Sequence, residues 1–260
     1  MTWWQGAVLG LVQGLTEFLP ISSDGHLDVA KALMRLPRSG LVFDLVVHLG
    51  TLCAVFVMYW GRLGELIRGA VRGDRAAWGY VALLAIGTVP AGIAGIALED
   101  FFSREFPPVE VGIQFLVTGL ILWSTRFVRP AAPDDRLTPG NATLIGIAQA
   151  AALFPAVSRS GTTVAAGMWL GMDPVRAGEF SFLLSIPAIA GAAVLEWPKL
   201  GGALQDVGVA PLAVGFAVSL VSGIFAIRWL IALLRRRAFH WFAPYCWIIG
   251  ILVIVWAWRA

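Results

Sequence analysis

Polar and ionisable side chains cluster near the start of an otherwise apolar chain. The stretch LTEFLPISSDGH, residues 15–26, carries a carboxylate at Glu17, a hydroxyl at Ser23 and an imidazole at His26. A carboxylate and an imidazole can exchange protons with a reacting group, or can bind a divalent cation. Gln13 precedes Glu17 by four residues, so on a helix the two side chains share one face. The stretch predicts an acid–base or metal site.

A second polar stretch, SRSGTT at residues 158–163, has the composition of an anion site. The Arg159 guanidinium is a planar fork of donors that matches phosphate oxygens. If a helix begins here, its free backbone N–H groups also favour an anion. The hydroxyls expected to complete a phosphate cradle belong to Ser158, Ser160 and Thr163.

Each stretch also has a simpler interpretation. The first could do no more than cap short helices, with Glu17 as a structural partner of Arg159. The second could be a cytoplasmic loop with one arginine that reaches the membrane surface. Capping requires neither Glu17 nor His26, and a carboxylate at membrane depth costs at least about 2.5 kcal/mol. A functional site is therefore the favoured interpretation.

The elements that must position these residues are membrane helices. The chain has 260 residues, of which 58% are hydrophobic and 13% charged, whereas soluble domains have about 25% charged residues. Six apolar runs reach the length of about 20 residues that spans a bilayer. They lie near Val42–Trp60, Trp78–Leu98, Val109–Thr125, Val175–Leu195, Val209–Leu234 and Phe239–Trp258. The composition predicts an all-α polytopic membrane protein with a single integral membrane domain, and no basic face for nucleic acid.

Two further apolar runs are too short to span a bilayer, and both end in a polar stretch. Trp4–Leu19 leads into PISSDGH and Ala142–Phe154 leads into PAVSRSGTT. Each is followed by another short run, Leu27–Leu36 and Val164–Gly171 respectively. We expect two re-entrant half-helix pairs, because broken backbone is tolerated at membrane depth only where protein or water surrounds it.

The order of the runs repeats within the chain. Residues 1–126 and 141–260 each contain a broken pair followed by three spans, and VLGLVQGLTEF resembles LIGIAQAAALF. An odd number of spans inverts the second copy, which predicts an inverted-topology repeat with the site where the two breaks meet. Arginines in the loops 61–75, 126–140 and 235–237 place those loops in the cytoplasm, although Lys31, Arg35 and Arg38 in segment 27–40 do not fit.

The two motifs resemble those of the undecaprenyl pyrophosphate phosphatase family (BacA/UppP). The first family motif has Glu or Gln, then Glu four positions later, then PxSSxGH; here these are Gln13, Glu17 and PISSDGH. The second, PGxSRSGxT, is matched by PAVSRSGTT. The stretches FDLVVHLGTL and EFSFLLSIP are also similar, so the resemblance covers nearly the whole chain.

The resemblance implies an enzyme that removes the terminal phosphate of C55 isoprenyl pyrophosphate, which recycles the lipid carrier of peptidoglycan synthesis. It implies a divalent cation, Mg²⁺ or Ca²⁺, and a link to bacitracin resistance. It places the protein in the bacterial inner (cytoplasmic) membrane, with its site facing the outer, periplasmic side. A homodimer is compatible with it.

The resemblance also assigns roles by motif position. Glu17 would be a catalytic carboxylate or the metal ligand, supported by Gln13. Ser23 and His26 would be candidates for nucleophile or acid–base, with water as a third nucleophile. Arg159 would clamp phosphate, and its neighbours in the cradle would be Ser158, Ser160 and Thr163.

Two residues depart from the family pattern. Asp24 stands where Ser or Thr is common, and it adds a negative charge that could strengthen cation binding. Ala156 replaces a Gly, which is harmless only if its backbone φ is negative. Among other polar residues, His48 is interpreted as part of a helix–helix hydrogen bond and His240 as interfacial. Glu179 is a candidate neighbour of the site.

Two other functions remain open at this level. Inverted repeats with central breaks are typical of transporters, so a polyprenyl-phosphate transporter or flippase is the main alternative. It would need Arg159 and the hydroxyls, but has less need of Glu17 with His26. A broader phosphatase for phosphatidylglycerol phosphate or shorter isoprenyl pyrophosphates is a third hypothesis.

Overall fold

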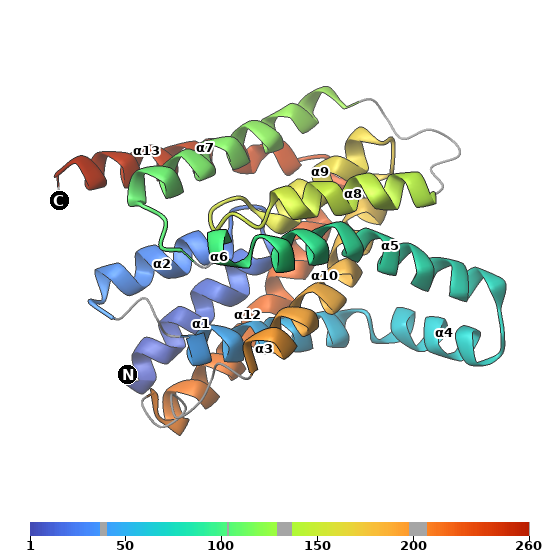
Figure 1. The fold of residues 1–260 in the computed structure, drawn as a ribbon, viewed down its shortest axis with the longest axis horizontal. Helices are drawn as coiled ribbons and strands as arrows, with labels where there is room; N and C mark the ends of the chain where they lie inside the picture. Colours follow the sequence, from blue (N-terminus) through green and yellow to red (C-terminus); the bar gives the residue numbers. More distant parts are fainter. Residues whose placement is uncertain (37–40, 103, 129–136, 198–206, 260) are drawn as a thin grey trace.

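The computed structural model describes residues 1–36, 41–102, 104–128, 137–197 and 207–259, and the regular elements in these ranges are helices (Figure 1). The first half contains α1 (Trp3–Phe18), α2 (Ser23–Leu33), α3 (Leu41–Met58), α4 (Trp60–Val71), α5 (Arg75–Ala97), α6 (Glu99–Phe102) and α7 (Pro108–Ser124). The second contains α8 (Pro139–Ala151), α9 (Arg159–Trp169), α10 (Pro174–Glu196), α12 (Val209–Arg235) and α13 (Ala243–Arg259). Short 3-10 turns, η1 (Thr125–Phe127) and η3 (Phe239–Phe242), follow α7 and precede α13.

The expected all-helical, multi-pass membrane protein is confirmed. Five helical segments of the described chain are long and apolar enough to cross a bilayer: Arg75–Ala97, Pro108–Phe127, Pro174–Glu196, Val209–Arg235 and Phe239–Arg259. A sixth span results if α3 and α4 are taken together, although they meet at an angle of 74°. The bend at Tyr59 lies at the end of the expected span Val42–Trp60, whereas most of the expected loop 61–75 is instead the helix α4.

Each of the two short apolar runs that end in a polar stretch forms a helix, and a break separates it from a second short helix, as expected. α1 has 16 residues and α2 has 11, whereas α8 has 13 and α9 has 11. Pro20 follows α1 and cannot donate the next helical hydrogen bond. Ser22 and Ser158 then cap α2 and α9, because their hydroxyls accept from the backbone N–H groups of Gly25 and Gly161.

Helices of the two halves pack closely against each other. α1 lies along α12, α8 lies along α5, and α7 lies beside α13 (Figure 1). A Cβ on Gly10 would lie 2.5 Å from the Gly215 backbone oxygen, and one on Gly146 would lie 2.5 Å from that of Gly87. Small residues at these crossings let the helix backbones approach, which is the usual device in membrane bundles. The packing brings the two breaks together inside the bundle.

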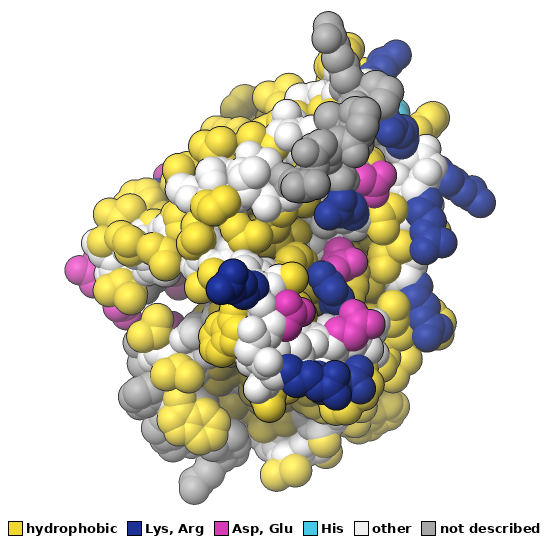
Figure 2. Space-filling view, turned by 90° about the vertical axis from the view of Figure 1, so that its right-hand side faces the viewer, with side chains coloured by type: hydrophobic (Ala, Val, Ile, Leu, Met, Phe, Trp, Pro, Cys, Tyr) yellow, Lys and Arg dark blue, Asp and Glu magenta, His cyan; other side chains and the backbone are white. Residues whose placement is uncertain are grey.

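Basic side chains gather at one end of the molecule (Figure 2). Figure 2 looks onto the end at the right of Figure 1, where α4 turns into α5, and shows Lys and Arg side chains around it. Arg68, Arg72 and Arg75 are exposed there. The expected loop 61–75 is thus reduced to the short turn between α4 and α5, and these arginines lie around that turn. Arg38, Arg129 and Arg136, which also entered the topology expectation, lie outside the described residues.

Candidate active site

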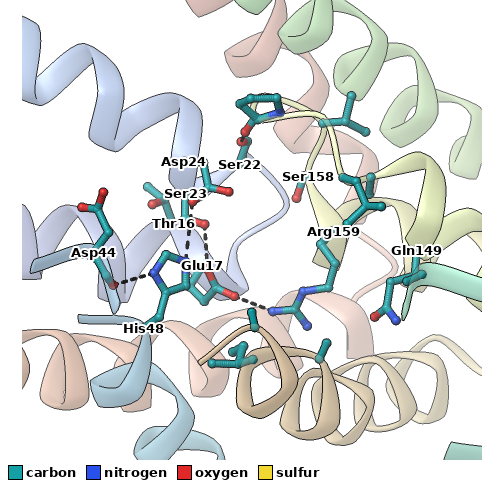
Figure 3. A pocket seen from close by; sticks show the side chains of 18 of the residues that line it. Thr16, Glu17, Ser22, Ser23, Asp24, Asp44, His48, Gln149, Ser158 and Arg159 are labelled. Carbon is teal, nitrogen blue, oxygen red and sulfur yellow. Dashed lines mark hydrogen bonds and ion pairs between the residues drawn. The ribbon is translucent and has the colours of Figure 1, made fainter. Parts of the chain in front are cut away.

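A cavity of about 440 Å³ lies where the two breaks meet. One part of its wall is polar and is built by Thr16, Glu17, Ser22, Ser23, Asp24, Asp44, His48, Gln149, Ser158 and Arg159 (Figure 3). The remainder is largely apolar and includes Leu45, Ala91, Leu153, Val157, Ala188, Ile189 and Ala192. A polar head joined to an apolar chain fits such a wall.

Glu17 is the centre of the polar wall. It lies one residue before the end of α1 and its side chain is 6% exposed. Ser23 donates its hydroxyl to Glu17 Oε2 at 2.6 Å, and Gln13 Nε2 donates to the same oxygen at 3.0 Å. The helical spacing of Gln13 and Glu17 thus produces the contact that the sequence predicted. A hydroxyl held by a buried carboxylate is the arrangement of a nucleophile with its base.

Arg159 joins the second break to the first. It is the first residue of α9, and its Nη2 donates to Glu17 Oε1 at 2.5 Å across 142 residues of sequence. Its Nη1 is buried and has no hydrogen-bond partner among the described residues. One nitrogen of the fork therefore holds the carboxylate while the other stays available to a ligand.

His48 and Asp24 extend the network along the same wall. His48 Nδ1 donates to the backbone oxygen of Asp44 at 2.7 Å, since a carbonyl can only accept. Its Nε2 lies 3.5 Å from Asp24 Oδ1 and 3.7 Å from Glu17 Oε2 (Figure 3). His48 does join helices, as interpreted from the sequence, but it also faces the cavity. In the sequence, His48 stands out only as a polar residue inside an apolar run, and this does not show which way its ring points.

A partly buried ion pair links α2 to α3 at this wall. Lys31, which is 3% exposed, donates to Asp44 Oδ2 at 2.5 Å. Asp44 lines the cavity, and its Oδ1 has no partner among the described residues. Lys31 was one of the basic residues that did not fit the expected topology. Its pairing with Asp44 inside the bundle accounts for Lys31, so this lysine need not lie in a cytoplasmic loop.

His26 points away from this network. Its Nδ1 donates to the Ser22 backbone oxygen at 2.7 Å, and its Nε2 lies 2.7 Å from the Tyr245 hydroxyl. The ring stacks on Tyr245 and meets Phe115 edge-on. His26 does not line the cavity in this structure. The predicted grouping of Glu17 with Ser23 is present, whereas His26 contacts α13 and α7.

The second break is fixed by α7. Thr118 donates to the Ala156 backbone oxygen at 2.9 Å and accepts from the Ser158 backbone N–H at 3.1 Å, and Gln114 accepts from the Ala156 N–H at 2.9 Å. Ala156 is fully buried and has no positive φ, so the alanine fits where the family has glycine. Ser22 and Gly25 from the first break both donate to the Pro155 backbone oxygen. The two breaks are thus hydrogen-bonded to each other.

The predicted cradle residues separate into two groups. Ser158 and Arg159 line the cavity. Ser160 donates to the Leu19 backbone oxygen at 3.3 Å, and Thr163 hydrogen-bonds with Ser181 of α10 at 2.6 Å. These last two side chains hold α9 against its neighbours and do not line the cavity.

Two further expectations concern residues elsewhere. Glu179 pairs with Arg62 at 3.2 Å, outside the cavity wall. His240 lies on the short turn η3 and contacts Trp241 there and Trp123 of α7.

The acidic residues of the wall suit a cation whose ligands come partly from the protein and partly from the substrate. Within the described residues, no three His, Cys, Asp or Glu side chains are arranged as a ready metal site. Mg²⁺ is usually held by one or two carboxylates together with substrate phosphates. Glu17 and Asp24 line the cavity with carboxylate oxygens 3.7 and 3.5 Å from His48 Nε2, and Asp44 Oδ1 has no partner among the described residues. This donor set fits an ion completed by phosphate oxygens.

Comparison with known proteins matches this chain to a family. The family model described as "Bacitracin resistance protein BacA" matches residues 6–252. The chain belongs to the BacA family. An "Undecaprenyl-diphosphatase" of Desulfatibacillum aliphaticivorans is 38% identical, and the alignment covers 98% of this chain and 99% of the relative. Proteins of the same name from Carboxydothermus hydrogenoformans and Bacteroides thetaiotaomicron are 39% and 36% identical, over 98% of this chain and 97% and 99% of theirs.

Membership of the BacA family confirms the resemblance seen in the two motifs. Both motifs lie within the matched residues, and each contributes residues to the cavity wall. The chemistry that this arrangement permits is attack on phosphorus by a hydroxyl, with a carboxylate as base and a guanidinium to offset charge.

Proposed function

We propose that this BacA-family protein is an undecaprenyl-diphosphatase, which releases the terminal phosphate of C55 isoprenyl pyrophosphate. The observation that carries this function is the hydrogen-bonded set of Ser23, Glu17 and Arg159 in one cavity. The apolar part of the wall suits an isoprenyl chain. The names of the full-length relatives support the same activity.

The reaction follows from the contacts of Ser23. Its oxygen attacks the terminal phosphorus, a new O–P bond forms, and the bond to the bridging oxygen breaks to leave the lipid monophosphate. Glu17 Oε2, which already accepts the Ser23 hydrogen bond, receives the proton. The free Nη1 of Arg159 binds the developing charge on the phosphoryl oxygens. Glu17 passes the Ser23 proton to the departing lipid monophosphate and is a carboxylate again. It then takes a proton from a water that attacks the phosphoserine phosphorus, the Ser23 O–P bond breaks, phosphate leaves, and Glu17 returns the proton to the Ser23 oxygen.

A divalent cation, Mg²⁺ or Ca²⁺, belongs to the same proposal. Glu17 and Asp24 would hold it together with phosphate oxygens, and the charge of the ion would offset that of the diphosphate. In this proposal Asp24, which departs from the family pattern, is a ligand of the cation.

We also propose that the two halves, 1–126 and 141–260, are an inverted repeat, with the cavity open to the outer face. The pattern of helix contacts supports this. If α1, α3, α5 and α7 correspond to α8, α10, α12 and α13, then the α1–α12 and α8–α5 contacts are equivalent, as are α3–α12 and α10–α5. The arginine-rich α4–α5 turn supports the orientation.

Phosphate release from farnesyl or undecaprenyl pyrophosphate in detergent tests the function. The wild type is compared with Glu17→Ala and Arg159→Ala, with Mg²⁺ or Ca²⁺ and with a chelator. We expect release that depends on the cation and is lost in both variants. A folded wild type that moves or binds the lipid without releasing phosphate would overturn the enzyme and favour a carrier.

The nucleophile requires a separate experiment. With substrate labelled in its terminal phosphate, acid quenching should trap label on the wild type but none on Ser23→Ala. Normal turnover by Ser23→Ala with no trapped label would show that water attacks. Label trapped on Ser23→Ala after an alkaline quench, in which phosphohistidine survives, would show that His26 attacks.

A further inference from the structure

Gln149 is a buried amide with no partner. It lies on α8, is 2% exposed, and lines the cavity. Neither its Nε2 nor its Oε1 has a hydrogen-bond partner among the described residues. Buried amides are almost always hydrogen-bonded in folded proteins, so one with both atoms unpaired calls for an explanation.

The corresponding residue of the first half shows what Gln149 lacks. Gln13 follows Gly10 by three residues, as Gln149 follows Gly146. Gln13 Nε2 donates to Glu17, four residues on, whereas the residue four positions after Gln149 is Leu153. The side chain of leucine cannot accept a hydrogen bond. The second half thus keeps the amide without the carboxylate that would satisfy it.

A second unpaired donor lies on the same wall. Arg159 Nη1 is buried and has no partner in the part of the chain that the structure describes. Figure 3 shows Arg159 between Glu17 on one side and Gln149 on the other. Both residues line the cavity. Two unpaired N–H donors facing one cavity match the oxygens of a diphosphate, which has only acceptors to offer when ionised.

We propose that Gln149 binds the lipid-side phosphate of the diphosphate by donating from Nε2. Ser23 and Glu17 lie on the far side of Arg159, so the phosphate next to Gln149 is the one that is not attacked. Arg159 then lies between the two phosphates, and Gln149 makes the site selective for a diphosphate over a monophosphate. This assignment rests on the proposed function, since it deepens the role of the same cavity.

The test compares Gln149→Leu and Gln149→Glu with the wild type in detergent. Three quantities are measured: kcat and KM for phosphate release from farnesyl pyrophosphate, Kd for its non-hydrolysable methylene-bridged analogue, and Tm without ligand. For Gln149→Leu we expect a tenfold or larger rise in the Kd of the analogue and in KM, with Tm unchanged or higher. Gln149→Glu should bind the analogue still more weakly, because a carboxylate repels phosphate.

Gln114→Leu is the matched control. Its amide is also buried but already accepts from the Ala156 N–H, so its loss should lower Tm. If Gln149 were structural, Gln149→Leu would behave in the same way, with a lower Tm and a Kd within twofold of the wild type. That result would overturn the proposal.

Two further results separate the inference from the function. An equal loss of affinity for farnesyl monophosphate would overturn the assignment to the lipid-side phosphate. A wild type that binds the analogue but releases no phosphate would overturn the proposed function alone, and the Kd values of the Gln149 variants would still decide the role of the amide.

Discussion

The two breaks meet at one cavity, but they are stabilised in opposite ways. At the first break the reactive side chains are satisfied, since the carboxylate of Glu17 accepts from Gln13, Ser23 and Arg159. At the second break the backbone is satisfied instead, by Gln114 and Thr118 of α7. Its side-chain donors at Gln149 and Arg159 Nη1 have no partner among the described residues.

This difference assigns a separate task to each break. Groups that must react are held in a fixed geometry before substrate arrives, which lowers the cost of reaching the transition state. Groups that must bind an anion are kept on a rigid backbone with donors left open. Variants that disturb one break and leave the other intact test this division of tasks.

The largest effect is expected at the carboxylate of the first break. Glu17→Gln should lower kcat for phosphate release about 10³-fold, because an amide cannot take the Ser23 proton. It also leaves the Arg159 guanidinium without its anion, which costs about 3 kcal/mol of stability. Kinetics and thermal unfolding in detergent measure both.

Glu65→Gln is the control for this variant. Glu65 pairs with Arg62 on an exposed face, so both quantities should remain within twofold or about 0.5 kcal/mol of the wild type. A Glu17→Gln protein with kcat within tenfold of the wild type would show that the first break does not hold the base.

The second-largest effect is expected for Arg159, the positively charged side chain of the second break. Arg159→Lys should lower kcat by about 10²-fold, since a single ammonium cannot hold Glu17 and also present a second planar donor to phosphate. The rate of phosphate release at saturating substrate measures this. Arg62→Lys, in the pair with Glu179, is the matched change outside the cavity and should have little effect. Full activity of Arg159→Lys would mean that charge alone is required there.

Loss of the α7 anchor tests the rigid backbone of the second break. Thr118→Val leaves the Ser158 N–H and the Ala156 carbonyl without a buried partner, which should cost about 2 kcal/mol. Activity should fall less than it does in Arg159→Lys, because the side chains of the cavity remain. Thermal unfolding compares it with Thr143→Val on the exposed face of α8, which should be neutral. An unchanged Tm would show that α7 does not fix this break.

The smallest effect is expected where the first break touches α13. Tyr245→Phe removes the hydroxyl next to His26 Nε2, at a cost of about 1 kcal/mol. The rate of phosphate release should change less than about threefold if His26 only anchors α2. A loss approaching that of Glu17→Gln would instead place His26 in the chemistry.

Most of the fold could be predicted from the sequence. Apolar runs of spanning length require helices in a bilayer, where the backbone must satisfy its own hydrogen bonds. Pro20 and Pro155 marked the breaks, because proline cannot continue a helix as a donor. The helix α4 was not predicted, because Arg62 and Arg68 interrupt the apolar sequence after Trp60 and favoured a loop there.

The site was predicted in its residue types but only in part in its contacts. Gln13 with Glu17 followed from helical spacing, which fixes neighbours on one face. Ser160 and Thr163 belong to the same motif as Arg159, yet they face other helices, because consecutive residues on a helix point in different directions.

The sequence by itself determined that this protein is a helical membrane protein of the BacA family, with a carboxylate at one break and an arginine at the other. Composition, run length and local motifs carry that information. Only the tertiary structure decided that Glu17 meets Arg159, that His48 faces Asp24 while His26 turns to Tyr245, and that Gln149 is left unpaired. Periodicity fixes which face of a helix a residue occupies. The partner across that face depends on how helices distant in sequence pack.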